Sequence, residues 1–339
     1  MSEPESPQGE RGVTRAGLSE ERALSEPGLR EPADFDVFWK QTMAETRAHP
    51  LGLSAEIVDC GLSTVEVYDV RFAGWAGEPV SAWLVLPRGR SGRLPCVVQF
   101  VGYGGGRGTP TEHLLWASTG RAHLVVDTRG QGSDTPDSAD GGPSGPGFLT
   151  RGVLDPHTWY YRRVFADGAR ALEAVRAHPA VDGRLVAVAG VSQGGGIALA
   201  AAALDGGVRA ALVDLPFLCD WPAALATAQS GPYGELVSFC AERPDRAAEA
   251  LSTVRYGDGV SFAARVTAPA LFSVAGRDRV CPPATVRAVF DAYAGPKRLV
   301  EYPFSEHEDA SGVRARVHAR EQISFLRGRC GGPLSSDGS

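Results

Sequence analysis

The chain has 339 residues, of which 43% are hydrophobic, and a formal net charge of −6. This length fits one large domain or two ordinary ones, and the hydrophobic content is typical of a globular protein. Acidic and basic residues are interspersed, so the sequence lacks the basic stripe of a nucleic-acid-binding protein and the basic amphipathic helix of a membrane-surface protein. We therefore expect a globular protein whose partners include neither nucleic acid nor a membrane.

The two ends of the chain differ in composition from the rest. Residues 1–30 are mainly Glu, Ser, Pro, Gly and Arg, and residues 329–339 are rich in Gly and Ser. We predict a polar, mostly disordered extension and a flexible tail on either side of a single domain over residues 31–328. The sequence has no apolar core of a signal peptide, no apolar run that could span a bilayer, and six cysteines without a Cys-x-x-Cys pair. These features favour a cytoplasmic protein with reduced thiols.

A helix and a hairpin are the first predicted elements. Residues 35–48 have an amphipathic helical pattern that ends before Pro50. Residues 64–70 and 80–86 alternate polar and apolar side chains with a period of two. This alternation predicts an antiparallel hairpin at the edge of a sheet.

From residue 95 onward, short apolar strands alternate with helices. The predicted strands span residues 96–101, 123–127, 184–189, 210–213, 270–274 and 298–302, and the predicted helical stretches span 158–177, 197–204, 219–253, 284–293 and 313–325. This alternation predicts a mostly parallel sheet with helices on both faces. Residues 133–156 form a long segment rich in Gly, Pro and Asp, for which we expect a role as a lid or an interface arm.

A Gly-x-Ser-x-Gly pattern centred on Ser192 lies between a predicted strand and a predicted helix. In that context the pattern is typical of the nucleophile elbow, the sharp turn that presents a catalytic serine in α/β-hydrolases. A serine on such a turn has a strained backbone, and side chains at Gly190 or Gly194 would collide with the neighbouring strand and helix. We predict that Ser192 is a nucleophile. The alternative is a turn that only joins the strand to the helix.

A serine nucleophile needs a base, and in α/β-hydrolases that base is a histidine late in the chain, on a loop after a strand. Two histidines follow Ser192 in the sequence. His307 comes directly after the predicted strand 298–302, whereas His318 lies within the predicted last helix, where we expect a surface position. We therefore predict that His307 is the base.

The third member of the group is a carboxylate that orients the base. Asp278 follows the predicted strand 270–274, and we favour it as this acid. Asp214, just after the strand 210–213, is the alternative, although it comes early in the chain order. The acidic residues beside the histidine, namely Glu306, Glu308 and Asp309, are expected to be solvated.

Two main-chain N–H groups are needed to bind the oxyanion that forms during acyl transfer. We predict the N–H of Gln193, directly after the nucleophile, and the N–H of Tyr103 on the glycine-rich loop 102–108. That loop matches neither the dinucleotide-binding nor the Walker pattern, and no His-Glu-x-x-His motif is present. We therefore expect no nucleotide, no other cofactor and no metal.

Several motifs together resemble those of carbohydrate esterase family 7, the acetyl xylan esterases that also act as cephalosporin C deacetylases. They are Arg129-Gly130-Gln131, the Ser192 motif, His307-Glu308, residues 278–283 and Gly102-Tyr103. The resemblance extends from about Pro32 to Leu326. It implies an α/β-hydrolase fold, a Ser192–His307–Asp278 triad and oxyanion donors at Tyr103 and Gln193.

The resemblance also implies a substrate class and an assembly. The expected reaction is deacetylation of short esters on sugars, such as xylo-oligosaccharides, or on the cephalosporin side chain, without a metal or cofactor. Arg129 and Gln131 are expected to support the loops around the site rather than react. Residues 133–156 correspond to the interface arm of a homohexamer.

Other interpretations of the same residues remain open. The fold could serve a peptidase or a longer-chain esterase, or a binding protein without catalytic activity. The neighbouring aromatic residues Trp159, Tyr160 and Tyr161 could stack on sugar, or they could be core or interface residues.

Overall fold

The computed structural model describes residues 31–132, 134–138, 147–227 and 231–330. The predicted extension, residues 1–30, and most of the predicted tail, 329–339, lie outside these residues. Within the described part of the chain, no helix is both long and apolar enough to cross a membrane.

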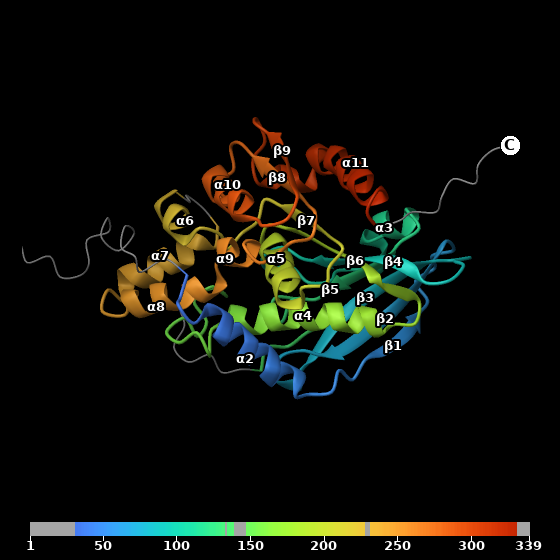
Figure 1. Ribbon diagram of the computed structural model, residues 1–339, viewed down its shortest axis with the longest axis horizontal. Helices are drawn as coiled ribbons and strands as arrows, with labels where there is room; N and C mark the ends of the chain where they lie inside the picture. The colour runs from blue at the N-terminus through green and yellow to red at the C-terminus, as the bar shows by residue number, and fades with distance from the viewer. Residues whose placement is uncertain (1–30, 133, 139–146, 228–230, 331–339) are drawn as a thin grey trace, which may run out of the picture.

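A nine-stranded sheet forms the centre of the described structure (Figure 1). Its strands are β1 (Ser54–Val58), β2 (Val65–Ala73), β3 (Pro79–Pro87), β4 (Leu94–Phe100), β5 (Ala122–Val126), β6 (Val181–Val191), β7 (Ala210–Asp214), β8 (Ala270–Ala275) and β9 (Lys297–Tyr302). Their order across the sheet is β1-β2-β3-β5-β4-β6-β7-β8-β9. The first three pairings are antiparallel and the other five are parallel, so the carboxyl ends of β4 to β9 lie at one edge of the sheet.

Helices cover both faces of this sheet, as the alternating pattern predicts. They are α2 (Phe35–Arg47), α3 (Leu115–Ser118), α4 (Tyr160–Ala177), α5 (Gln193–Asp205), α6 (Trp221–Thr227), α7 (Tyr233–Glu242), α8 (Ala247–Val254), α9 (Gly259–Ala263), α10 (Pro283–Ala292) and α11 (Val313–Arg327). Helices α4 and α5 pack on one face, with α2, α9 and α10 beside them, and α3 and α11 pack on the other. The predicted α/β class is confirmed.

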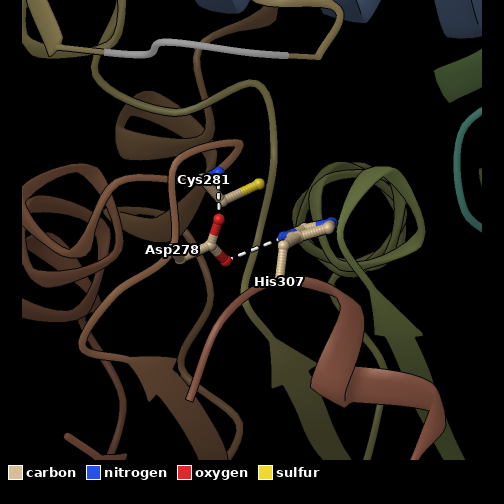
Figure 2. A group of neighbouring side chains, drawn as sticks. All are labelled: Asp278, Cys281 and His307. Atoms are coloured by element: carbon tan, nitrogen blue, oxygen red, sulfur yellow. Dashed lines mark hydrogen bonds and ion pairs between the residues drawn. The ribbon is translucent and has the colours of Figure 1, made fainter. Parts of the chain in front are cut away.

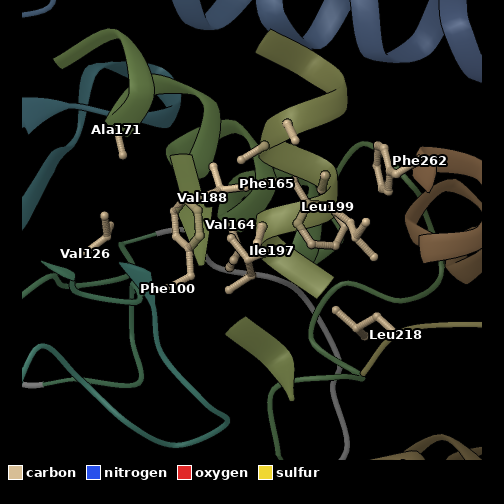
Figure 3. Packing of buried hydrophobic residues seen from close by; sticks show 14 of the residues in the cluster. Phe100, Val126, Val164, Phe165, Ala171, Val188, Ile197, Leu199, Leu218 and Phe262 are labelled. Carbon is tan, nitrogen blue, oxygen red and sulfur yellow. The ribbon is translucent and has the colours of Figure 1, made fainter. Parts of the chain in front are cut away.

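Alternate residues of the central strands point to opposite faces and form two separate cores. Val98 and Val188 join the larger core under α4 and α5, whereas Val97 and Ala187 join the smaller core beneath α11. Figure 3 shows the larger core, where Ile197 of α5 packs among side chains from the sheet and α4. Because both faces of the central strands are buried, β7 and β8 are almost entirely apolar, whereas the edge strand β9 is partly exposed and carries charged residues.

Three details differ from the sequence-based expectation. The predicted hairpin, β2 and β3, is confirmed, but it does not form the edge of the sheet because β1 pairs outside it. Neither strand β1 nor the four-residue helix α3 was predicted from the sequence. Both elements are short, and neither has a marked apolar pattern. The stretch 219–253 is divided into α6, α7 and α8, with Pro232 directly before α7 and Pro244 after it.

The described parts of the segment 133–156 have no regular secondary structure and are anchored to the body of the chain. Thr135 accepts a hydrogen bond from the N–H of Ser81 (3.0 Å), and Asp137 pairs with Arg163 (2.8 Å). The carbonyl of Leu149 accepts a hydrogen bond from the indole N–H of Trp159 (2.8 Å). The role of this segment as an interface arm stays a prediction.

Candidate active site

Ser192 lies on the turn between β6 and α5, at the carboxyl edge of the sheet. Its backbone has φ 58° and ψ −122°, a conformation that non-glycine residues rarely adopt. A side chain at Gly190 would place its Cβ 2.1 Å from the carbonyl carbon of Gly194, and one at Gly194 would lie 2.2 Å from the carbonyl oxygen of Phe100. The two glycines of the motif are therefore required by the close approach of β6, α5 and the end of β4.

A chain of hydrogen bonds connects the side chains of Ser192, His307 and Asp278. The hydroxyl of Ser192 lies 3.1 Å from Nε2 of His307, and Nδ1 of the same ring lies 2.7 Å from Oδ2 of Asp278. His307 comes from the loop after β9 and Asp278 from the loop after β8. The structure thus brings together the three residues predicted as a triad, from three separate strand ends.

Asp278 is held in place from both of its oxygen atoms. Figure 2 shows its carboxylate between His307 and the backbone of Cys281. Oδ1 accepts hydrogen bonds from the N–H groups of Val280 and Cys281, each 2.8 Å long. The residue is 4% exposed, so these bonds replace the water that a carboxylate would otherwise bind. A carboxylate fixed in this way fixes the imidazole in turn.

The alternative acid, Asp214, pairs with the other histidine. Its Oδ1 lies 2.6 Å from Nε2 of His318, and its Oδ2 accepts a hydrogen bond of 2.6 Å from Gln322. His318 is 3% exposed, so the expectation of a surface position was wrong. The helical pattern did not reveal that α11 turns this side chain inward toward Asp214. Glu306, Glu308 and Asp309 are exposed, as predicted.

Cys281 lies beside the hydroxyl of Ser192, with Sγ 3.9 Å from Oγ. Together with Asp278 and His307 it offers three possible metal-ligand atoms within 4.8 Å of one another. The chemistry of this group does not favour a metal: burial raises the pKa of the Cys281 thiol well above its usual value, and metals bind the thiolate. Both oxygens of Asp278 already accept hydrogen bonds.

Tyr103 and Gln193, the predicted oxyanion donors, come from the loop after β4 and from the start of α5. The N–H of Gln193 belongs to the first turn of α5, where main-chain N–H groups have no acceptor within the helix. Tyr103, on the loop after β4, lines the same cavity as Ser192. Its hydroxyl donates a hydrogen bond to Glu235 (2.5 Å) and accepts one from the N–H of Phe148 (2.7 Å), which fixes the loop.

Gln131 connects the two predicted oxyanion donors. Its side-chain amide pairs with that of Gln193 through two hydrogen bonds of 2.8 and 3.0 Å. Its Oε1 also accepts the N–H of Gly104, next to Tyr103, at 2.7 Å. Tyr161 donates a further hydrogen bond to Oε1 of Gln193 (2.8 Å). The glycine-rich loop and the start of α5 are therefore joined through the half-buried amide of Gln131.

Arg129 is buried and surrounded by carboxylates. Its guanidinium donates two hydrogen bonds to Asp167, of 2.6 and 2.9 Å, and one to Glu78. Its carbonyl oxygen accepts a hydrogen bond from the hydroxyl of Tyr160. These contacts fix the loop after β5, which also carries Gln131.

The aromatic residues at the start of α4 belong to the core. Trp159, Tyr160 and Tyr161 are each at most 1% exposed, and none of them lines the cavity at Ser192. Their polar atoms hydrogen-bond within the chain. The sugar-stacking hypothesis is therefore wrong, and the core interpretation is confirmed.

A cavity of about 750 Å³ opens beside Ser192. His307 and Tyr103 line it near the nucleophile, and it continues past Trp116 along α11 as far as Gln322. The triad therefore faces a space much larger than an acetyl group.

Comparison with known proteins places this arrangement in a family. The acetyl xylan esterase (AXE1) family model matches residues 23–326. The chain belongs to the acetyl xylan esterase family. The predicted family resemblance is thereby confirmed, together with the α/β-hydrolase fold and the class of enzyme, a carboxylic ester hydrolase.

Individual relatives agree with this assignment. An acetyl xylan esterase from Paenibacillus sp. R4 is 36% identical, with a TM-score of 0.85 over 92% of this chain and 99% of the other. Acetyl xylan esterase 1 from Thermoanaerobacterium sp. JW/SL YS485 is 29% identical, with a TM-score of 0.81 over 90% and 98% of the two chains. The acetyl esterase Axe7A of Xylanibacter ruminicola is 29% identical over 86% of this chain and 67% of its own length.

Several residues around the site could not be found from the sequence. Glu235 contacts Tyr103 from 132 positions away, and Asp167 contacts Arg129 from a helix with no marked motif. In the sequence, only the family resemblance pointed to this region. It identified Arg129 and Gln131 but not the residues that they contact.

Replacing Arg129 with methionine should strongly destabilise the fold. The substitution leaves the carboxylate of Asp167, 6% exposed, without its counter-ion, and breaking such a buried pair costs about 3–5 kcal/mol. Urea unfolding followed by circular dichroism measures the loss. Arg184→Met, which removes an arginine whose side chain is 89% exposed, is the matched control and should leave the urea midpoint almost unchanged. Equal stability of the two variants would contradict this role of Arg129.

Proposed function

We propose that this enzyme removes acetyl groups from small O-acetylated substrates, including short acetylated xylo-oligosaccharides, through an acyl-enzyme on Ser192. The observation that carries the proposal is the continuous contact from Asp278 through His307 to the hydroxyl of Ser192, at the wall of a large cavity. Membership of the acetyl xylan esterase family supports the acetyl specificity.

In the first half of the reaction, Nε2 of His307 accepts the hydroxyl proton of Ser192 while Oγ bonds to the acetyl carbonyl carbon. The ester C–O bond then breaks, and His307 returns the proton to the departing alcohol. In the second half, water gives a proton to His307 and attacks the acetyl carbon. The bond to Oγ breaks, His307 returns this proton to Oγ to restore the serine hydroxyl, and acetate leaves. Asp278 stabilises the imidazolium that forms in both halves.

The N–H groups of Gln193 and Tyr103 are the proposed donors to the carbonyl oxygen as it becomes negative. The start of α5 favours negative charge because its first N–H groups and its dipole point toward the turn. We propose that Gln131 and Arg129 act indirectly by keeping the two donors at a fixed separation. The amide pair between Gln131 and Gln193 and the hydrogen bond to Gly104 support this role.

Ser192→Ala and His307→Ala should each lower kcat/KM for p-nitrophenyl acetate by roughly 10⁴-fold or more. The double variant should lose little more than either single variant, because the residues act as a unit. Steady-state kinetics measures all three variants. His49→Ala and Ser54→Ala, at exposed positions, are the matched controls and should retain normal activity. Modest losses that add in the double variant would contradict the mechanism.

The acyl group should be short. We expect kcat/KM to fall from p-nitrophenyl acetate through butyrate to octanoate. We assign the large cavity to the alcohol and a methyl-sized space to the acyl group, so each added methylene would overfill that space. The same enzyme should release acetate from cephalosporin C, and Ser192→Ala should abolish that release. Activity that rises beyond the four-carbon ester would instead favour a longer-chain esterase, the alternative specificity.

We also propose a homohexamer in which residues 133–156 contribute to the contacts between chains, as the family resemblance implies. Multi-angle light scattering should give a mass near six times that of the chain. A monomer over the whole concentration range would contradict this assembly.

A cytoplasmic location is the remaining proposal. All six cysteines are unpaired in the structure, which is consistent with a reducing compartment.

A further inference from the structure

Arg314 is a buried cation in the wall of the active-site cavity. The residue is 9% exposed and lines the same cavity as Ser192 and His307. Its Nε is buried without a hydrogen-bond partner, and within the described part of the chain the side chain forms no ion pair. By contrast, Arg129 and Arg163, which are buried as deeply, each pair with carboxylates. A guanidinium N–H removed from water without an acceptor is unfavourable, so the position of Arg314 needs an explanation.

The position of Arg314 in its helix increases the local positive charge. It is the second residue of α11, a helix of 15 residues that has no acidic residue in its first turn and no side-chain cap at Gly312. The free N–H groups and the dipole at a helix start already favour an anion there. Ala310 and Ser311, just before this helix start, also line the cavity. The first turn of α11 and the guanidinium therefore form one positive end of the cavity.

This end of the cavity is held rigidly against the sheet. One turn after Arg314, His318 is bound between Asp214 (2.6 Å) and the hydroxyl of Tyr302 (2.9 Å). Gln322, one turn further, binds the second oxygen of Asp214 at 2.6 Å. The guanidinium carbon of Arg314 lies over the ring of Tyr302, 5.1 Å from its centroid. Arg314 is thus positioned by a packed helix, as a binding residue needs to be.

The two acidic residues in the cavity wall do not neutralise Arg314. Both oxygens of Asp214 are already bound, by His318 and Gln322, and Asp214 makes no ion-pair contact with Arg314. Glu308 is exposed to solvent. Among the described residues the guanidinium makes no hydrogen bond or ion pair, so its terminal N–H groups are left for a group that enters the cavity.

We propose that the positive end of the cavity binds a carboxylate carried by the alcohol portion of the ester substrate, with Arg314 as the specificity-determining residue. This inference rests on the proposed acetyl-esterase function. An acetyl group cannot itself carry the charge, so the charge has to belong to the alcohol. The cavity of about 750 Å³ leaves room for that portion between Ser192 and α11. The preferred substrate class is accordingly an acetylated sugar acid or another acetylated hydroxy acid.

The test compares 4-(acetoxymethyl)benzoate with its neutral analogue, 4-(acetoxymethyl)benzamide, by measuring acetate release. The wild-type enzyme should prefer the carboxylate, and Arg314→Met should lower the ratio of the two kcat/KM values by roughly 10- to 100-fold, the size of one charge-assisted hydrogen bond. Arg316→Met removes an exposed arginine from the same turn and should leave the ratio unchanged. A third ester, in which a phosphate replaces the carboxylate, tests which of the two anions the site prefers.

Each outcome is decisive. An unchanged ratio in Arg314→Met, or equal losses on both substrates, would overturn the proposal, and a larger Arg314-dependent preference for the phosphate would replace carboxylate as the ligand. Thermal unfolding gives a second measurement, because Arg314→Met removes an unpaired buried charge and should not lower Tm; a large fall in Tm would show a structural role instead.

If wild-type enzyme hydrolyses neither ester nor p-nitrophenyl acetate, the proposed function fails. If it hydrolyses the neutral esters without preferring the charged one, only the present inference fails.

Discussion

The hydrogen bond from the N–H of Ser192 to the carbonyl of Asp214, 2.9 Å long, holds the turn on which the site depends. A second one runs from the N–H of Phe217 to the carbonyl of Ser192 (3.0 Å). A residue with the backbone angles of Ser192 carries strain of order 1–3 kcal/mol and keeps them only when its surroundings allow no alternative. Here those surroundings are main-chain atoms of β4, β7 and α5, which approach so closely that Gly190 and Gly194 have no space for a side chain.

Asp214 binds the Ser192 turn through its main chain and helix α11 through its side chain. Its carbonyl oxygen fixes the turn at Ser192, and its carboxylate fixes α11 through His318 and Gln322. The wall that carries Arg314 is therefore anchored to the same strand end as the serine. The position of a substrate that spans the cavity would consequently be set by one rigid unit rather than by two loops that move independently.

The opposite side of the site depends on a buried polar network. Gln131 joins the loop of Tyr103 to Gln193, and Tyr161 completes the acceptor capacity of that second amide. Buried networks of this kind are favourable only when every member is satisfied, and they then define one geometry. The proposed oxyanion donors are main-chain groups, so we expect their separation to depend on these side chains.

The sequence by itself determined the α/β class, the family and the three residues that meet at the strand ends, because each of these leaves a local pattern: apolar runs, a Gly-x-Ser-x-Gly turn, and an acid and a histidine directly after strands. Only the tertiary structure decided the strand order, the added edge strand β1, the pairing of Asp214 with His318 and the partners of Tyr103 and Arg129. These features depend on which segments are packed side by side, and contacts between residues more than a hundred positions apart, such as Tyr103 and Glu235, leave no periodicity in the chain. The burial of Arg314 belongs to the same group, since helical spacing shows that a side chain lies on one face of α11 but not what that face meets.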